Sequence, residues 1–131
     1  MKKLFALSLS LLMMVSCSSA QKEIQVGALS FDEYLPLLEG KRVSILSNQT
    51  GMVSSTTHLL DTLLDMGVNV VSIMSPEHGF RGVADAGEHV SSSIDPDTGI
   101  PIRSLYESGV NRPSDESMAE FDVMVFDLQD V

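Results

Sequence analysis

Two short apolar runs with an amphipathic helical pattern between them constrain the fold of this chain most strongly. The runs are Val43 to Leu46 and Val68 to Met74, and four leucines between residues 59 and 64 recur at the spacing of one helix face. Strands that are apolar along their whole length are typical of parallel sheets with helices on both faces. The pattern therefore predicts a strand, a helix and a second strand, with the strands parallel and the crossover right-handed.

The helices have recognisable starting points in the sequence. Leu29 to Leu38 carries apolar residues at roughly helical spacing, with Ser30 as the expected N-cap and Gly40 as the stop. The helix between the two strands is expected to be capped by Ser54 or Ser55, because a serine hydroxyl accepts from the first free N–H groups of a helix. Both helices should pack on the sheet.

A long irregular stretch separates the second strand from a third. Residues 75–120 are rich in Ser, Asp, Gly and Pro, and a loop of that length usually serves function or contains small elements of its own. Ile102 to Tyr106 is a candidate short strand or turn, and Ser114 to Ala119 a candidate short helix. Phe121 to Leu128 is the third strand. The chain ends soon afterwards, so we expect an α/β domain that is truncated before completion.

Each of the three strands ends in a cluster of polar side chains. The clusters are Asn48 and Gln49 after the first strand, Glu77 and His78 after the second, and Gln129 and Asp130 after the third. Because the carboxyl ends of parallel strands meet at one edge of a sheet, we expect these side chains to converge on one crevice.

The segment from Ser75 to Gly82 carries the strongest candidate for chemistry. Glu77 is suited to general acid or base work, because a carboxyl group in a partly closed loop can have its pKa raised. His78 could share a proton with it or orient a substrate. In the alternative interpretation, Glu77 caps nearby amides and His78 packs against Phe80.

Arg81 has two interpretations as well. Its forked guanidinium is suited to gripping a carboxylate or a phosphate of a substrate. The alternative is a salt bridge within the protein, to Asp85 or Glu88. The nearby run Asp95 to Gly99 has the composition of a turn, and turn chemistry explains it.

Metal and nucleotide sites have little support in the sequence. Glu88 and His89 repeat the pairing of Glu77 and His78, and both residue types bind zinc, but adjacent side chains project in different directions and no pair of histidines has the helical i, i+4 spacing. The loop from Ser47 to Gly51 lacks a Walker-type lysine and a dinucleotide-binding glycine pattern. We therefore expect neither a metal nor another cofactor.

The amino terminus has the pattern of a secretory signal. Lys2 and Lys3 precede an apolar run to Val15, which is too short to span a bilayer, and small residues follow. Cleavage before Cys17, with lipidation of that single cysteine, competes with cleavage after Ala20. The expected organisation is a signal peptide over 1–16, a linker over 17–28 and the domain over 29–131.

The charge of the exported chain is strongly acidic. The net charge is −10, and removing Lys2 and Lys3 with the leader takes it to −12. Such a surface repels nucleic acid and anionic membranes, so contact with a membrane is expected only through a lipid anchor. The predicted location is the periplasm or, for a lipoprotein, the outer membrane.

Six motifs, taken in order, resemble the exo-β-N-acetylmuramidase family. They are Gly40-Lys41-Arg42-Val43 with Ser47-Asn48-Gln49-Thr50-Gly51, Ser75-Pro76-Glu77-His78-Gly79-Phe80-Arg81-Gly82, Ala86-Gly87-Glu88, Asp97-Thr98-Gly99-Ile100-Pro101, Ser104-Leu105-Tyr106 and Phe126-Asp127-Leu128-Gln129-Asp130-Val131. The resemblance implies a Rossmann-like parallel sheet with flanking helices, followed by a smaller domain, with the active site between them. It also implies a secreted hydrolase that removes N-acetylmuramic acid from the non-reducing end of peptidoglycan fragments.

Roles for the candidate residues follow from that resemblance. A glycosidase ordinarily needs two carboxyl groups, and Glu77 is expected to be one, with Glu88, Asp130 or a residue beyond Val131 as the other. The lactyl carboxylate of muramic acid gives Arg81, or the backbone amides after Ser47, an anion to hold. Asn48, Gln49 and Gln129 are expected to bind the sugar hydroxyls and the acetamido group. His78 and Asp130 are expected to bind the substrate as well.

Two alternatives from other classes stay open at this stage. The first is a peptidoglycan-binding lipoprotein that holds a muropeptide or disaccharide without cleaving it. The second is a metal-dependent hydrolase that uses His78 and His89. Because the resemblance implies a second domain, this fragment alone is expected to be inactive.

Overall fold

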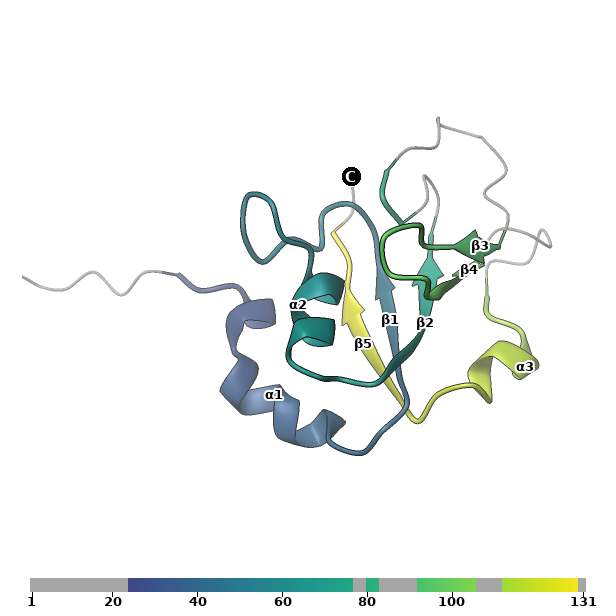
Figure 1. Ribbon diagram of the computed structural model, residues 1–131, viewed down its shortest axis with the longest axis horizontal. Helices are drawn as coiled ribbons and strands as arrows, with labels where there is room; N and C mark the ends of the chain where they lie inside the picture. The colour runs from purple at the N-terminus through teal and green to yellow at the C-terminus, as the bar shows by residue number, and fades with distance from the viewer. Residues whose placement is uncertain (1–23, 77–79, 83–91, 106–111, 130–131) are drawn as a thin grey trace, which may run out of the picture.

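The described strands form one sheet with helices beside it (Figure 1). The computed structural model describes residues 24–76, 80–82, 92–105 and 112–129. In chain order the elements are the 3-10 turn η1 (Gly27–Leu29), α1 (Phe31–Leu38), β1 (Val43–Ser47), α2 (Leu59–Asp65), β2 (Val70–Ser75), β3 (Ser93–Ile94), β4 (Pro101–Ser104), α3 (Asp115–Met118) and β5 (Val123–Asp127). The order across the sheet is β3-β4-β2-β1-β5.

Most neighbouring strands are parallel. β1 pairs in parallel with both β2 and β5, and β2 pairs in parallel with β4. The two-residue strand β3 is antiparallel to β4 and extends the sheet at one edge. The predicted α/β class and the parallel arrangement of the three apolar strands are therefore confirmed.

The core lies between one face of the sheet and the helices α1 and α2. Ile45 lies opposite Ile73 and Val125 in the register, which places these three side chains on one face. Ile45 and Ile73 are fully buried, together with three leucines of α2. Burial of one such side chain contributes about 1.5–3 kcal/mol, so the leucine stripe is sufficient reason for α2 to pack where it does. In Figure 1 both helices lie on the same side of the central strands, and α3 lies on the other side of the picture.

The start of α2 differs from the prediction. Its N-cap is His58, whose imidazole Nδ1 accepts a hydrogen bond from the N–H of Leu60 at 3.1 Å. Ser54 instead accepts from the N–H groups of Thr56 and Thr57, at 3.2 and 3.0 Å, and so closes a turn of its own. The prediction of a cap at Ser54 or Ser55 is wrong, because these serines belong to a loop that folds back before the helix.

Other boundaries shift by smaller amounts. β2 begins at Val70 rather than Val68, because Gly67 takes a φ of 79° and the N–H of Val68 still bonds to a helix carbonyl. Packing against the core begins inside the predicted linker, where Ala28 contacts the hydrophobic cluster. The predicted helix after Ser114 is present as α3, with the Ser114 hydroxyl as its cap.

None of the helices in the described part of the chain is long and apolar enough to cross a membrane.

Candidate functional site

The carboxyl ends of β1 and β5 are joined by the side chain of Asn48. Its Nδ2 donates to the backbone carbonyl of Gln129 at 3.2 Å, and its Oδ1 accepts from the N–H and the hydroxyl of Thr50 at 2.9 and 2.6 Å. Asn48 is buried, whereas Gln129 is exposed. The structure thus brings together two of the strand-end residues chosen from the sequence. It also occupies most of the hydrogen-bonding capacity of Asn48 within the fold.

Gln49 presents an acceptor that the described residues leave unpaired. Its Oε1 is buried and has no hydrogen-bond partner among them. The aliphatic part of the side chain lies against Gly82, where an added Cβ would approach Gln49 Cβ to 2.9 Å. Gln49 also borders a cavity of about 130 Å³. An unpaired buried carbonyl costs about 1–3 kcal/mol, so this group is well suited to accept from a bound donor.

His58 is a central residue of this edge that sequence reasoning missed. Its Nε2 lies 2.9 Å from the carbonyl oxygen of Asn48. Because Nδ1 accepts from Leu60, the proton is assigned to Nε2, which therefore donates to Asn48. The ring meets Phe80 edge to face, with centroids 4.6 Å apart. His58 thus fixes the loop after β1 to the start of α2. Its position directly before the leucine stripe was the one available signal, but histidine is not among the usual N-cap residues.

Burial lowers the pKa of His58 below its ordinary value of 6.5, although the hydrogen bond to Asn48 acts in the opposite direction. The unfolded chain therefore binds a proton at this ring before the folded protein does as pH falls. The contribution of His58 to stability is present above about pH 6.5 and is lost as pH drops through the folded pKa.

We expect His58→Asn to flatten this part of the pH dependence, because asparagine can cap a helix but does not titrate. The measurement is the free energy of unfolding of the intact protein at about pH 7.5 and about pH 5.5. The wild type should lose more stability than the variant over this range. Equal losses would show that His58 is not a source of the pH dependence.

Arg81 lies in a cluster of carboxylates. Its Nε and Nη2 donate to the two oxygens of Asp95 at 3.0 and 2.9 Å, and weaker contacts reach Asp61 on α2 at 3.3 and 3.4 Å. Asp97 lies 3.7 Å away, and the guanidinium carbon stands 5.0 Å from the Phe80 ring centre. Arg81 thus forms salt bridges within the protein. The described partners are different acids from those proposed, and Asp85 and Glu88 lie outside the described residues.

Asp95 was expected only to form a turn with the residues up to Gly99, but its carboxylate also pairs with Arg81. Its side chain is fully buried, and it accepts a further hydrogen bond from the Thr98 hydroxyl at 2.6 Å. Burial alone raises the pKa of Asp95, but the hydrogen bonds from Arg81 and Thr98 outweigh it and hold the pKa below its ordinary value. The hydrogen bond to Asp95 is the main reason that the pKa of Arg81 is raised. The pair therefore stays ionised throughout the physiological range.

Several predicted site residues lie outside the described residues. They are Cys17, Glu77, His78, Glu88 and Asp130. Their roles stay predictions. Within the ranges that the structure describes, no group of three or more His, Cys, Asp or Glu side chains is placed to hold a metal ion.

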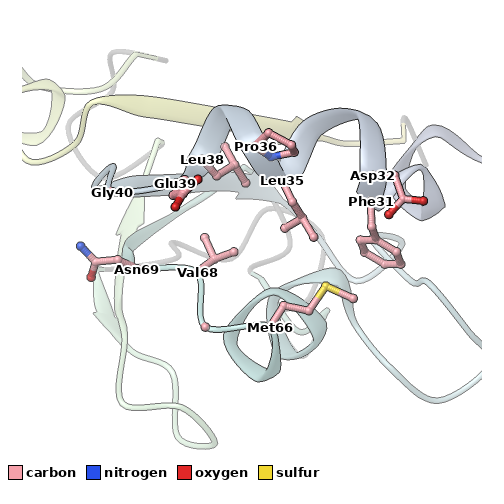
Figure 2. Close-up of a pocket in the computed structure, with 11 residues that line it drawn as sticks. Phe31, Asp32, Leu35, Pro36, Leu38, Glu39, Gly40, Met66, Val68 and Asn69 are labelled. Carbon is pink, nitrogen blue, oxygen red and sulfur yellow. The ribbon is translucent and has the colours of Figure 1, made fainter.

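A cavity of about 590 Å³ lies away from these residues, between α1 and the turn that follows α2. Figure 2 shows it lined by apolar side chains such as Leu35 and Val68, with Glu39 and Asn69 at one end. Its lining residues lead into β1 and β2, so it borders the amino ends of the strands. It contains none of the residues chosen from the sequence as site candidates.

The sequence and the fold both match known proteins. Residues 43–131 match the family described as exo-beta-N-acetylmuramidase NamZ, N-terminal. The peptidoglycan beta-N-acetylmuramidase NamZ of Bacillus subtilis is 37% identical over 100 residues, which cover 76% of this chain and 24% of that protein. The chain thus spans about a quarter of the length of this curated relative.

Two crystal structures of DUF1343 family proteins from Bacteroides fragilis resemble the described fold. One shares 46% sequence identity and a TM-score of 0.66, and the match covers 83% of this chain and 26% of that chain. The other shares 36% identity and a TM-score of 0.63, with coverages of 76% and 24%. The α/β fold is therefore that of the family.

Proposed function

The chain belongs to the exo-β-N-acetylmuramidase NamZ family, and we propose that the intact protein is an exo-acting glycoside hydrolase. In this proposal it removes N-acetylmuramic acid from the non-reducing end of peptidoglycan fragments during cell-wall turnover. The observation that carries the proposal is the 37% identity to a peptidoglycan muramidase over most of this chain. The convergence of Asn48 and Gln129 at one sheet edge supports a site there. Because the chain spans about a quarter of that relative, we propose that it supplies one wall of the cleft.

The proposed chemistry uses two carboxyl groups. One protonates the oxygen of the leaving sugar while the other activates a water molecule or attacks the anomeric carbon. We propose Glu77, which follows β2 by two positions, as one of the pair. The second is Glu88, Asp130 or a residue beyond Val131. His78 would orient the substrate or share a proton with Glu77.

The polar residues at the sheet edge are proposed to hold the sugar. Gln49 is the best supported, because its buried Oε1 has no partner among the described residues and can accept from an amide or a hydroxyl. Gln129 is exposed at the end of β5, and its neighbour Asp130 is assigned the same role. Asn48 would contribute mainly by holding the ends of β1 and β5 together.

The contacts of Arg81 argue against a role in holding the lactyl carboxylate. Its guanidinium already faces Asp61, Asp95 and Asp97 within 4 Å. Three carboxylates around one guanidinium leave a local excess of negative charge, which repels an anionic ligand.

The test is hydrolysis of chromogenic sugars by the intact protein. We expect cleavage of an N-acetylmuramide at a rate at least about tenfold above that of the matching N-acetylglucosaminide. A chelator should leave the rate unchanged, whereas loss of activity would favour a metal-dependent hydrolase. Binding of a muropeptide without any release of sugar would favour the alternative of a peptidoglycan-binding lipoprotein.

We further propose that the protein is exported and anchored through Cys17. The pattern of residues 1–20 supports this proposal. In cells fed a labelled fatty acid, the wild type should carry the label and sediment with membranes, and Cys17→Ser should lose both properties. A variant that still sediments with membranes and still carries label would contradict lipidation at this residue, and Ser18→Ala serves as the matched control.

A further inference from the structure

We propose that a small cavity beside the carboxyl ends of β1 and β2 holds the acetamido group of the sugar and is too small for longer acyl groups. The cavity has a volume of about 130 Å³ and is lined by the loop after β1, the first turn of α2 and the neighbours Phe80 and Arg81. The inference rests on the proposed function, since it assigns one substituent of N-acetylmuramic acid to one place at this edge of the sheet.

Gln49 supplies a hydrogen-bond acceptor for such a ligand. Its side chain lines the cavity, and its buried Oε1 has no hydrogen-bond partner among the described residues. Buried acceptors without a partner are rare in native proteins, because they destabilise the fold. The last torsion of a glutamine side chain is soft, so a small rotation can turn Oε1 toward an N–H group in the cavity. The N–H of an acetamido group would complete this pairing.

The cavity also has an apolar wall. Phe80 is 2% exposed, and its ring is held edge to face against the buried ring of His58, with centroids 4.6 Å apart. Met52 lines the same cavity and is 38% exposed, so it borders solvent. A methyl group can pack against these side chains, whereas a hydroxyl finds no hydrogen-bond partner on this wall. An acetamido group combines a methyl with a polar amide and therefore matches both walls.

The charges around Arg81 disfavour the other substituent of muramic acid, the lactyl carboxylate. The guanidinium lies within 4 Å of Asp61, Asp95 and Asp97, so one positive and three negative formal charges leave a net charge of −2. A neutral acetamido group meets no such repulsion. Its carbonyl can accept from Arg81 Nη1, whose contact with Asp61 is long, at 3.4 Å. Of the two substituents, the acetamido group is therefore the one that fits.

The size of the cavity allows a test with altered substrates on the intact protein. The substrates are chromogenic muramides that carry an N-acetyl group, an N-butanoyl group or a free amine. We expect kcat/KM to be at least about tenfold higher for the N-acetyl than for the N-butanoyl substrate, because two additional methylene groups exceed the available space. The free amine should also react at least about tenfold more slowly, because it lacks the methyl and the carbonyl. This comparison needs no variant and so does not depend on the folding of one.

Met52→Ala enlarges the cavity at its apolar wall. The preference for the N-acetyl over the N-butanoyl substrate should fall about fivefold or more, mainly because the N-butanoyl substrate reacts faster. Met66→Ala is the matched control, since Met66 is 47% exposed and borders the separate cavity between α1 and the turn after α2. Its preference should equal that of the wild type.

Gln49→Met removes the acceptor but keeps the length of the side chain. We expect kcat/KM for the N-acetylmuramide to fall about threefold to tenfold, which is the usual worth of one hydrogen bond. The denaturant midpoint should not fall, because a buried acceptor without a partner is removed. A merely structural role for Gln49 would lower this midpoint. Gln25→Met is the matched control, because Gln25 is exposed and lines a different cavity.

Equal kcat/KM for the N-acetyl and N-butanoyl substrates in the wild type would overturn the inference, and so would an unchanged preference in Met52→Ala or an unchanged kcat/KM in Gln49→Met. Equally fast reaction of the free amine would overturn it too, by showing that the negative charges hold a cation. A wild type that hydrolyses none of the muramides would instead overturn the proposed function, and this inference with it.

Discussion

Replacing Glu77 with glutamine should lower kcat on an N-acetylmuramide by about a hundredfold or more. The amide keeps the shape of the side chain but can neither give up nor accept the proton that glycoside cleavage requires, and general acid or base catalysis is worth about 10²–10⁴ in rate. KM should change little, because the substitution leaves the rest of the cleft intact. Steady-state kinetics of the intact protein provide the measurement.

Glu39→Gln is the matched control for this prediction. Glu39 is exposed, follows α1 and borders the cavity at the amino ends of the strands, so it lies at the opposite edge of the sheet. Its kinetics should match those of the wild type. A Glu77→Gln variant with a near-normal rate would remove Glu77 from the catalytic pair.

Replacing Gly51 with alanine should destabilise the protein by about 1–3 kcal/mol through overpacking. A Cβ at Gly51 would collide with the Ser47 hydroxyl and lie 2.9 Å from His58 Nε2. Both neighbours are buried, and His58 also holds the Asn48 carbonyl, so neither can move without disturbing the loop after β1. The measurement is the free energy of unfolding in denaturant.

Gly27→Ala gives the matched control, because a Cβ there would meet nothing within 4 Å. Its stability should stay close to that of the wild type. If Gly51→Ala unfolds at the same denaturant concentration as Gly27→Ala, the contact between Gly51 and His58 has no importance for the fold.

The arrangement of the strands was readable from the sequence because it depends on local patterns. β1, β2 and β5 are apolar along most of their length, and the leucines of α2 mark one face of a helix. The parallel order then follows from general rules of α/β connections. β4 was predicted as a strand or a turn, and its pairing with β2 shows that it is a strand.

The contacts of the site depend on tertiary structure and could not be read in the same way. Asp95 and Arg81 are separated by 14 residues, and nothing in the turn-like run after Asp95 reveals that its carboxylate is buried. Similarly, His58 caps α2 only because the preceding loop folds back, as the bridge between Met52 and His58 shows. The sequence pattern predicted that polar residues would lie at the carboxyl ends of the strands. It did not predict the hydrogen-bond and ion-pair partners of these residues.

Hydrogen bonds and an ion pair connect the loops at the carboxyl ends of the strands to neighbouring elements. Asn48 links β1 to β5, His58 links the loop after β1 to α2, and Arg81 links the loop after β2 to the turn before β4. The catalytic and binding groups of an active site must be held in place to within a fraction of an ångström, and supporting contacts of this kind restrict their movement. The three contacts thus tie described loops at this edge to β5, to α2 and to the turn before β4.

The most direct measurement identifies the sugars that the intact protein releases from defined peptidoglycan fragments. Mass spectrometry should show free N-acetylmuramic acid released stepwise from fragments that carry it at the non-reducing end. Fragments that begin with N-acetylglucosamine should stay intact. Release of disaccharides or longer pieces, or equal cleavage of both kinds of fragment, would contradict an exo-acting muramidase.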